Sequence, residues 1–259
     1  MHLHVWDRCF LLRAQSLVLP VDVRPHKRLS ATLIVARGKP FEVTGIGPGP
    51  SVHQALFFAP NVPRIGLNAV GADLMILDAS IATPAYYQLQ PALQPDGVRA
   101  LTASELERIL PLTVGWDMAL DCRAAKALFT ALVHALGNAD AAVPVLDARI
   151  EKVMEQVAAL PLDELVWPVL ARGVGLSESR LRALFSTNLG CAPAQYARWI
   201  KTWGAIQLWQ KGKSFTEVAH AAGFYDLAHV DHALKELFGM SATAMAVAKG
   251  VHYHPCGAE

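Results

Sequence analysis

Residues 215–235 read FTEVAHAAGFYDLAHVDHALK, and residues 168–185 read PVLARGVGLSESRLRALF. In both stretches an alanine comes four residues before a glycine, an apolar residue follows that glycine, and a polar residue comes next or one position later. Glycine adopts the positive φ of a tight turn at little cost, and Ser177 and Asp226 suit the N-cap of a following helix. The repeated pattern predicts two helix-turn-helix units.

The segment between these two stretches predicts one long helix. Residues 193–212 read PAQYARWIKTWGAIQLWQKG, with Pro193 suited to a first helical position and Gly212 to an end. About eighteen helical residues span roughly 27 Å, which approaches the ~34 Å between successive major grooves on one side of DNA. From Leu146 onward the pattern is helical throughout.

The first 98 residues or so have the pattern of β structure. Short runs of strand length, several of them rich in Val, Ile and Phe, alternate with Pro and Gly clusters, which is typical of a sandwich or small barrel. The expected strands are residues 17–23, 31–36, 41–44, 51–58, 64–68 and 73–78.

Two helices are expected to trail this β region. Thr102 and Glu105 form a capping box that begins the first helix, and Pro111 ends it. The second spans 118–136, with one apolar stripe. Two interpretations of the stripe stay open: it packs against the β region, or it forms a homodimer. The stripe consists of Cys122, Ala125, Phe129, Leu132 and Leu136.

The overall expectation is an α+β protein of two domains. A β-barrel or sandwich with trailing helices occupies 1–139, a linker 140–146, and an all-α domain 147–249. Residues 250–259 are expected to be a disordered tail, in preference to a metal site built from His252, His254 and Cys256. His2 and His4 are expected on one face of an edge strand.

Composition excludes several classes of protein. The 259 residues are 53% hydrophobic and 17% charged, too apolar for a disordered chain. No apolar run approaches the ~20 residues of a membrane span, and the N-terminus lacks the pattern of a signal peptide. We therefore expect a cytoplasmic protein. Its widely spaced cysteines are expected to be free thiols; they are Cys9, Cys122, Cys191 and Cys256.

From Leu146 to about Met245 the sequence resembles the AraC/XylS family of bacterial transcription regulators. The matching residues are Gly175, Leu176, Ser177, Leu181, Leu184, Phe185, Gly190, Pro193, Tyr196, Ala205, Leu208, Glu217, Val218, Ala219, Gly223, Phe224, Asp226, His229, Lys235, Phe238 and Gly239. The resemblance implies a double helix-turn-helix domain that binds double-stranded DNA. The β region weakly resembles the cupin-like sensors of the same regulators.

The second helix of each unit supplies the candidate DNA contacts. Arg182 is the first choice for a base reader, because arginine pairs bidentately with guanine. Lys201, Lys213 and Lys235 are candidates for phosphate contacts, and the other candidates are Ser177, Glu178, Ser179, Arg180, Tyr225, His229 and His232. For any single residue here, a solvated surface side chain is an equally good interpretation.

The near-neutral net charge of the helical domain argues against tight binding to DNA. From Asp147 to Lys249 there are 11 basic and 10 acidic residues, so the net charge is +1. Since phosphate neutralisation supplies much of the affinity for DNA, we expect weak or effector-dependent binding. Leu227 and Ala228 stand where polar base readers are usual in the family, and Asp231 repels phosphate.

The β region is expected to bind a small organic effector, with no cofactor and no metal. The candidate lining residues are Trp6, His26, Phe41, Phe58, Arg64 and Tyr86, although core packing explains the aromatic residues equally well. An enzymatic cupin needs clustered His and Glu ligands, and His26 and His53 lie far apart in the sequence. We therefore do not expect an enzyme.

These observations favour a sequence-specific transcription regulator controlled by a small molecule. The alternative is a protein-interaction or sequestering module that keeps the helical fold with weakened DNA binding, which the near-neutral charge motivates. A cupin-type enzyme with a helical appendage is a further alternative.

Overall fold

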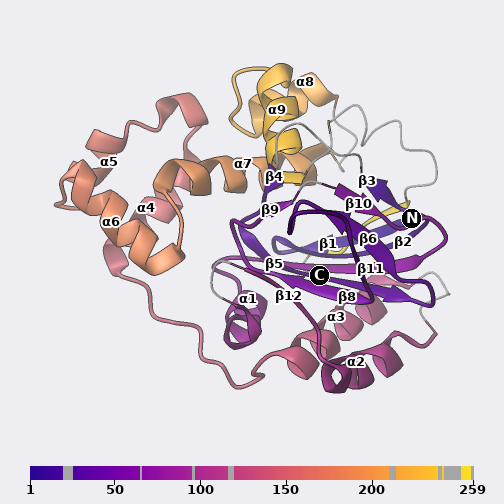
Figure 1. The fold of residues 1–259 in the computed structure, drawn as a ribbon. Coiled ribbons are helices and arrows are strands. Elements are labelled where there is room, and N and C mark those ends of the chain that lie inside the picture. The colour runs from indigo at the N-terminus through magenta and orange to yellow at the C-terminus, as the bar shows by residue number, and fades with distance from the viewer. Residues whose placement is uncertain are drawn as a thin grey trace. The chain divides into compact units, whose positions relative to one another are not determined.

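The computed structural model describes residues 1–19, 26–64, 66–94, 97–115, 120–209, 214–238, 241 and 252–257. The chain forms two compact units, which we call the β unit and the helical unit (Figure 1). The β unit consists of Met1–Val143 and Ala248–Glu259, and the helical unit of Pro144–Val247. None of the helices in these described ranges is long and apolar enough to span a membrane.

The β unit is built on a seven-stranded sheet in which neighbouring strands are antiparallel, except for one parallel pair, β1 and β13. In spatial order the strands are β12 (Val98–Ala100), β8 (Ala55–Phe58), β5 (Ser30–Arg37), β11 (Asp73–Ser80), β2 (Cys9–Gln15), β1 (His2–Trp6) and β13 (His252–Pro255).

Two smaller sheets complete the β structure. The four-stranded sheet has the order β3 (Val18–Leu19), β10 (Gly66–Asn68), β6 (Phe41–Thr44) and β7 (Ser51–His53). A two-stranded sheet pairs β4 (His26–Lys27) with β9 (Pro63–Arg64). The expected β region is therefore present, a strand at His2 and His4 is confirmed as β1, and β2 is a strand that the sequence pattern did not predict.

The central strands β5 and β11 are buried on both faces, and most of their side chains are apolar. Because side chains alternate along a strand, Leu33 and Val35 of β5 contact the core shared with the helices. Thr32 and Ile34 instead line a cavity with residues of the four-stranded sheet. The face of the sheet that carries Leu33 and Val35 is covered by three helices (Figure 1). They are α1 (Pro84–Leu89), α2 (Ala103–Ile109) and α3 (Cys122–Leu136).

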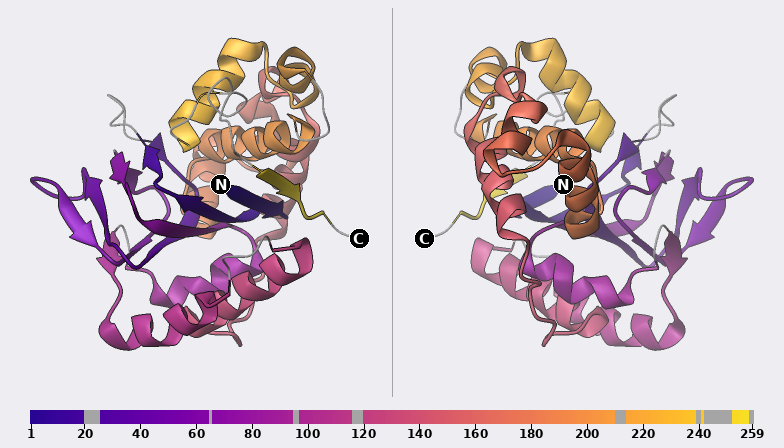
Figure 2. Two further views of the ribbon diagram at one scale, coloured as in Figure 1. Left: turned by 90° about the vertical axis from the view of Figure 1, so that its right-hand side faces the viewer. Right: turned by 90° about the vertical axis from the view of Figure 1, so that its left-hand side faces the viewer.

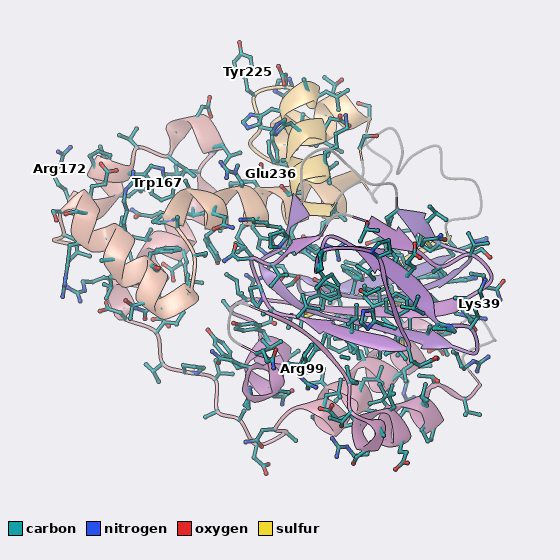
Figure 3. The ribbon with its side chains drawn as sticks, in the orientation of Figure 1. Lys39, Arg99, Trp167, Arg172, Tyr225 and Glu236 are labelled. Atoms are coloured by element: carbon teal, nitrogen blue, oxygen red, sulfur yellow. A yellow bond between two sulfur atoms is a disulfide. The ribbon has the colours of Figure 1, made fainter. Side chains whose placement is uncertain are left out.

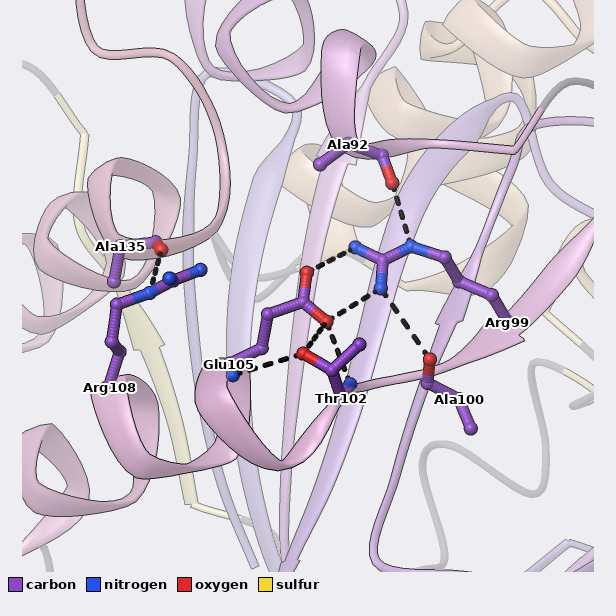
Figure 4. Close-up of polar contacts among 7 residues, drawn as sticks. All are labelled: Ala92, Arg99, Ala100, Thr102, Glu105, Arg108 and Ala135. Atoms are coloured by element: carbon purple, nitrogen blue, oxygen red, sulfur yellow. Dashed lines mark hydrogen bonds and ion pairs between the residues drawn. The ribbon is translucent and has the colours of Figure 1, made fainter.

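Helix α2 begins with the predicted capping box. The Thr102 hydroxyl accepts from the Glu105 amide, and the Glu105 carboxylate accepts from the Thr102 amide. Arg99 adds a bidentate pair to the same carboxylate, with both N–O distances 2.8 Å (Figure 4). These hydrogen bonds from Arg99, together with those from Thr102, lower the pKa of Glu105 to about 2. Short 3-10 turns follow α1 at Gln90–Ala92 and α2 at Leu110–Thr113.

The apolar stripe of α3 packs inside the β unit itself. Phe129 contacts Trp6 edge to face, with ring centroids 5.0 Å apart, and Ala125, Leu132 and Leu136 are buried in the same core. A homodimer through residues 118–136 would therefore have to use the outward face of α3, because its apolar face is already covered. Residues 118 and 119 lie outside the described part of the chain.

Two expectations about the cysteines and the C-terminus were wrong. Cys122 and Cys256 form a disulfide, so they are not free thiols; Cys9 and Cys191 are free and buried. Residues 252–255 form strand β13, so this part of the expected tail is ordered, and His2 and His4 lie on a strand one place in from the sheet edge. The pairing joins residues 134 positions apart, a separation that no local spacing indicates.

The helical unit consists of helices and one 3-10 turn in its described residues. These are α4 (Ala148–Ala159), a 3-10 turn (Leu162–Glu164), α5 (Trp167–Gly173), α6 (Glu178–Leu189), α7 (Pro193–Trp209), α8 (Phe215–Ala221) and α9 (Leu227–Phe238). The long helix α7 contacts α4, α6, α8 and α9. Its Trp199 and Trp203 are almost fully buried and meet edge to face with centroids 6.0 Å apart, so α7 forms the core of the unit.

Candidate nucleic-acid interface

The two predicted helix-turn-helix units share one turn geometry. The Leu176 amide donates to the Ala171 carbonyl, and the Phe224 amide donates to the Ala219 carbonyl, both at 2.9 Å. Both alanines are fully buried. Two sequence positions that correspond in the repeat therefore make the same hydrogen bond, which indicates that α5–α6 and α8–α9 are equivalent units.

A glycine at positive φ stands in each turn. Gly175 has φ of 69° and Gly223 has φ of 80°, a conformation that disfavours residues with a Cβ atom. Around Gly175 a Cβ would meet open space, whereas at Gly223 it would lie 2.9 Å from the Cα of Pro161. Glycine is therefore required at 223 both by the positive φ and by the close approach of Pro161, and at 175 by the positive φ alone.

Both second helices begin at the predicted caps. The Ser177 hydroxyl accepts from the Arg180 amide at 3.3 Å, and the Asp226 carboxylate accepts from the His229 amide at 2.8 Å. These caps fix where α6 and α9 begin and hence which side chains occupy their first turns.

Helix α6 divides into a buried and an exposed face. Leu181, Phe185 and Leu189 are buried, while Arg180 and Arg182 are exposed. The guanidinium of Arg182 donates to the Glu178 carboxylate, with Nε–Oε1 at 3.0 Å. Two polar groups that suit base recognition thus lie one turn apart on the same face, and in this structure they bind each other.

Helix α9 exposes a mixed surface. Tyr225, just before the helix, is 75% exposed and points away from the helical unit (Figure 3). Leu227 is partly exposed. His229 and His232 are exposed, and the His229 ring meets the buried Phe224 edge to face at 5.2 Å.

Basic side chains of α9 also lie close to carboxylates on the same helix. Lys235 lies 2.7 Å from Asp231, and the ring of His232 lies 4.0 Å from Glu236. Glu236 additionally pairs with Arg198 of α7 at 3.6 Å. Each pair is partly solvent exposed, so it contributes little stability, but it reduces the local positive charge that phosphate would meet.

Lys201, one of the predicted phosphate contacts, is buried inside the helical unit. Lys201 is only 8% exposed and its ammonium donates to the Ala158 carbonyl at 2.8 Å; burial lowers its pKa. The structure therefore corrects the expectation that Lys201 contacts phosphate, because the helix places it in the core of the unit. Lys213 lies outside the described residues.

The β unit contains a small cavity. Strands of the seven-stranded and four-stranded sheets contribute its walls. The lining residues are Leu19, Arg28, Thr32, Ile34, Val43, Phe58, Gly66, Leu67 and Ile76. Most of them are aliphatic or aromatic, and Arg28 is the charged member of the set, an arrangement typical of a small-molecule site.

Arg28 belongs to a buried polar network. Its guanidinium lies 3.1 Å from the Oδ2 atom of Asp78 and 5.4 Å from the centroid of the Phe10 ring. Asp78 is fully buried and also accepts from Ser30 at 2.8 Å and from Thr32. A buried cation with buried partners at the wall of an apolar cavity is the feature that sequence reasoning missed. Arg28 to Thr32 alternate in polarity, but the partner on β11 is 50 residues away.

Of the six predicted ligand-binding residues, Phe58 lines the cavity. Trp6 and Tyr86 pack against the core on the helix-covered side of the sheet, so they do not line this cavity. Phe41 is buried and lies near the His53 ring, at 6.4 Å between centroids. The backbones of His26 and Arg64 pair with each other, and their side chains lie outside the described part of the structure.

No group of three or more His, Cys, Asp or Glu residues within the described ranges is arranged to hold a metal ion.

Comparison with known proteins supports the assignment of the helical unit. The profile of a helix-turn-helix domain family matches residues 170–246, which lie within the helical unit. No curated protein sequence matches the chain.

Solved structures show the same fold over nearly the whole chain. An apo variant of ToxT from Vibrio cholerae gives a TM-score of 0.58 at 9% identity, covering 92% of this chain and 96% of that one. Wild-type ToxT bound to an unsaturated fatty acid gives 0.57 at 11% identity, covering 94% and 96%. ToxT bound to (E)-4-(8-methylnaphthalen-1-yl)but-3-enoic acid gives 0.50 at 10% identity, covering 90% and 95%. At this level of identity the likeness shows the fold alone, a β region followed by a helical domain.

Proposed function

We propose that this protein is a transcription regulator that binds duplex DNA with α6 and α9 and is controlled by a small apolar acid bound in its β unit. The observation that carries the DNA-binding part is the repeated turn, in which Leu176 and Phe224 make the same 2.9 Å hydrogen bond. That turn presents the exposed face of a second helix, which is the element that enters a major groove in helix-turn-helix proteins.

The spacing of the two units supports the same proposal. Helix α7 connects them with 17 residues, a length of about 26 Å. Successive major grooves on one side of DNA are ~34 Å apart. A rigid helix of this length, with α6 contacting its first part and α8 and α9 also packed on it, suits two reading helices that occupy neighbouring grooves.

Base recognition is assigned first to Arg182, with Ser179, Arg180, His229 and His232 also exposed on the reading helices. An arginine–guanine pair discriminates against other bases by ~1–3 kcal/mol. Because Arg182 is bound to Glu178, DNA must compete with this carboxylate. Glu178 can in turn accept a hydrogen bond from the amino group of cytosine.

The effector site is assigned to the cavity around Arg28. Guanidinium groups bind carboxylates bidentately, and the aliphatic wall formed by residues such as Ile34, Leu67 and Ile76 suits a hydrocarbon tail. ToxT, whose fold this chain shares, has been crystallised with two ligands that are apolar carboxylic acids. A ligand carboxylate at Arg28 would share the guanidinium with Asp78.

DNA binding is tested by fluorescence anisotropy with the DNA upstream of the gene, at several salt concentrations and against random DNA. A regulator gives a steep salt dependence and a preference for the specific site. Weak binding with neither property would instead support a protein-interaction module, which the paired charges of Arg182 and Lys235 also favour.

Effector binding is tested by calorimetry with a long-chain unsaturated fatty acid and its methyl ester, which lacks the charge. We expect the acid to bind and the ester to bind much more weakly. The double variant Arg28→Gln, Asp78→Asn removes both members of the buried ion pair without leaving an unpaired charge, so it should abolish the preference for the acid while the fold is kept. Equal binding of acid and ester by the wild type would contradict this site.

A further inference from the structure

The C-terminal strand returns to the beginning of the chain. Strand β13 lies parallel to β1, with His2 opposite His252 and His4 opposite His254, as the yellow and indigo strands in Figure 2 show. The His252 amide donates to the Met1 carbonyl and the Cys256 amide to the Val5 carbonyl, both at 2.8 Å. Along the sequence, the helical unit is therefore inserted between two segments that both belong to the β unit.

Two His-x-His sequences meet across this strand pair. Alternation along each strand puts all four imidazoles on one face, and they stack in the order His252, His2, His254, His4. The successive centroid distances are 4.8, 5.5 and 4.4 Å. We call this set the histidine ladder.

One hydrogen bond of the ladder requires a neutral ring. Nδ1 of His2 lies 3.2 Å from Nε2 of His254, and one of these nitrogens must accept, which a doubly protonated imidazolium cannot do. Nε2 of His4 donates to the Leu120 carbonyl at 2.8 Å. Burial, followed by the charges of neighbouring histidines, lowers the pKa of His2 and of His254. The close stack is therefore incompatible with several positive charges.

The charged groups on neighbouring elements do not remove this repulsion. Arg13 of β2 stands opposite His2 and binds Asp73 of β11 at 3.3 Å. The N-terminal ammonium lowers the pKa of His2 further. On α3, Asp121 caps the helix and Lys126 donates to the Gly257 carbonyl at 3.5 Å. The described contacts of the four rings are with one another and with the Leu120 carbonyl.

A covalent bond reinforces the same segment. The disulfide joins Cys122, the first residue of α3, to Cys256 directly after β13. Cys122 is half-buried and Cys256 is buried, so a reductant reaches the Cys122 sulfur more easily. While the disulfide is intact, β13 cannot leave even if the ladder is protonated.

We propose that the Cys122–Cys256 disulfide and the neutral histidine ladder each hold β13 against β1. Strand β13 is released from β1 only when a thiol reductant opens the disulfide and the histidine ladder also becomes protonated. A reductant thiolate attacks the Cys122 sulfur and the S–S bond breaks. A second reductant thiol then resolves the mixed disulfide. Two protons end on Cys122 and Cys256, and the two reductant thiols become a disulfide, so electrons balance. Release leaves the helical unit tethered only at its N-terminal side.

The test is hydrogen exchange of the full chain, followed by mass spectrometry of peptides that contain residues 252–256. Oxidised and reduced protein are each compared at about pH 7.5 and about pH 5, with rates corrected for intrinsic exchange. We expect protection of this segment to fall by at least about tenfold in the reduced, acidic sample alone, with the central strands β5 and β11 still protected. Equal protection in all four samples overturns the proposal, as does loss of protection in the oxidised acidic sample.

Variants separate the contribution of the disulfide from that of the histidine ladder. Cys256→Ser should release β13 at acid pH without reductant, whereas Cys191→Ser, which removes a buried thiol of the helical unit, should behave as wild type. His254→Gln removes a titrating ring from the ladder and should keep β13 protected in reduced protein at acid pH. His134→Gln, an exposed histidine on α3, is its matched control. Identical exchange of the His254→Gln variant and wild type would refute the role of the ladder.

Discussion

Alanine substitution at the two turn glycines, Gly175 and Gly223, should destabilise the helical unit to different extents. Both have positive φ, so alanine at either position carries the strain of a left-handed conformation, ~1–2 kcal/mol. This strain is partly offset by the lower entropy of the unfolded chain with alanine, ~0.4–1 kcal/mol. For Gly175→Ala a Cβ meets nothing within 4 Å, so we expect a net cost of about 1 kcal/mol.

Gly223→Ala should cost more. Its Cβ would lie 2.9 Å from the Cα of Pro161, and backbone cannot rotate aside as a side chain can. Overpacking of this kind costs ~1–3 kcal/mol, for a total of about 2–4 kcal/mol. The same shift strains the hydrogen bond from the Leu162 amide to the Gly223 carbonyl, which is 2.9 Å long.

The assay is urea-dependent hydrogen exchange of peptides from α6 and α9, which reports the free energy of unfolding of the helical unit. The two variants serve as controls for each other, because they share the positive φ and differ in the contact. Equal destabilisation by the two substitutions, or a larger effect at Gly175, would refute the reasoning that the approach to Pro161 makes glycine necessary at 223.

Three other predictions concern charge. If α6 reads DNA as proposed, Glu178→Gln frees Arg182 and removes a negative charge from the exposed side of α6, so affinity for specific DNA should rise several-fold and the salt dependence should steepen in anisotropy titrations. Lys201→Met should leave DNA affinity unchanged within about twofold, because the ammonium is buried on a backbone carbonyl; a large loss would show that Lys201 does reach phosphate. Glu105, whose folded pKa is about 2, stabilises the protein above its ordinary pKa, and this stabilisation is lost as pH falls from about 4.5 toward 2. In urea titrations Glu105→Gln should therefore lower the free energy of unfolding by about 1–2 kcal/mol at neutral pH and flatten its dependence on pH below 4.5; an unchanged dependence would refute the assignment.

Local sequence signals predicted the helical unit well. A turn glycine, its preceding alanine and the following cap lie within eight residues of one another, so the pattern of residues 171–177 and 219–226 contains the whole motif. The capping box at Thr102 and Glu105 is likewise local, and it is present. Strand β6 was predicted with its observed bounds, Phe41–Thr44.

What the sequence did not reveal depends on contacts between distant residues. The Arg28–Asp78 pair and the Cys122–Cys256 disulfide each join elements that only the sheet topology brings together. Lys201 was assigned to the surface because a lysine usually is, and the packing of α7 against α4 buries it. The pairing of β1 with β13 was missed because β13 comes from the other end of the chain.

Strand β13 is synthesised long after β1, the strand with which it pairs, and this delay has a consequence for folding during biosynthesis. At ~5–20 residues per second, a ribosome makes residue 252 roughly 10–50 s after residue 6. During that interval the nascent β1 has no neighbour on its outer side, and an open strand edge invites pairing with other chains. Premature termination after the helical unit would leave this edge bare permanently. A truncated product with an intact helical unit would therefore tend to aggregate through its N-terminal strand.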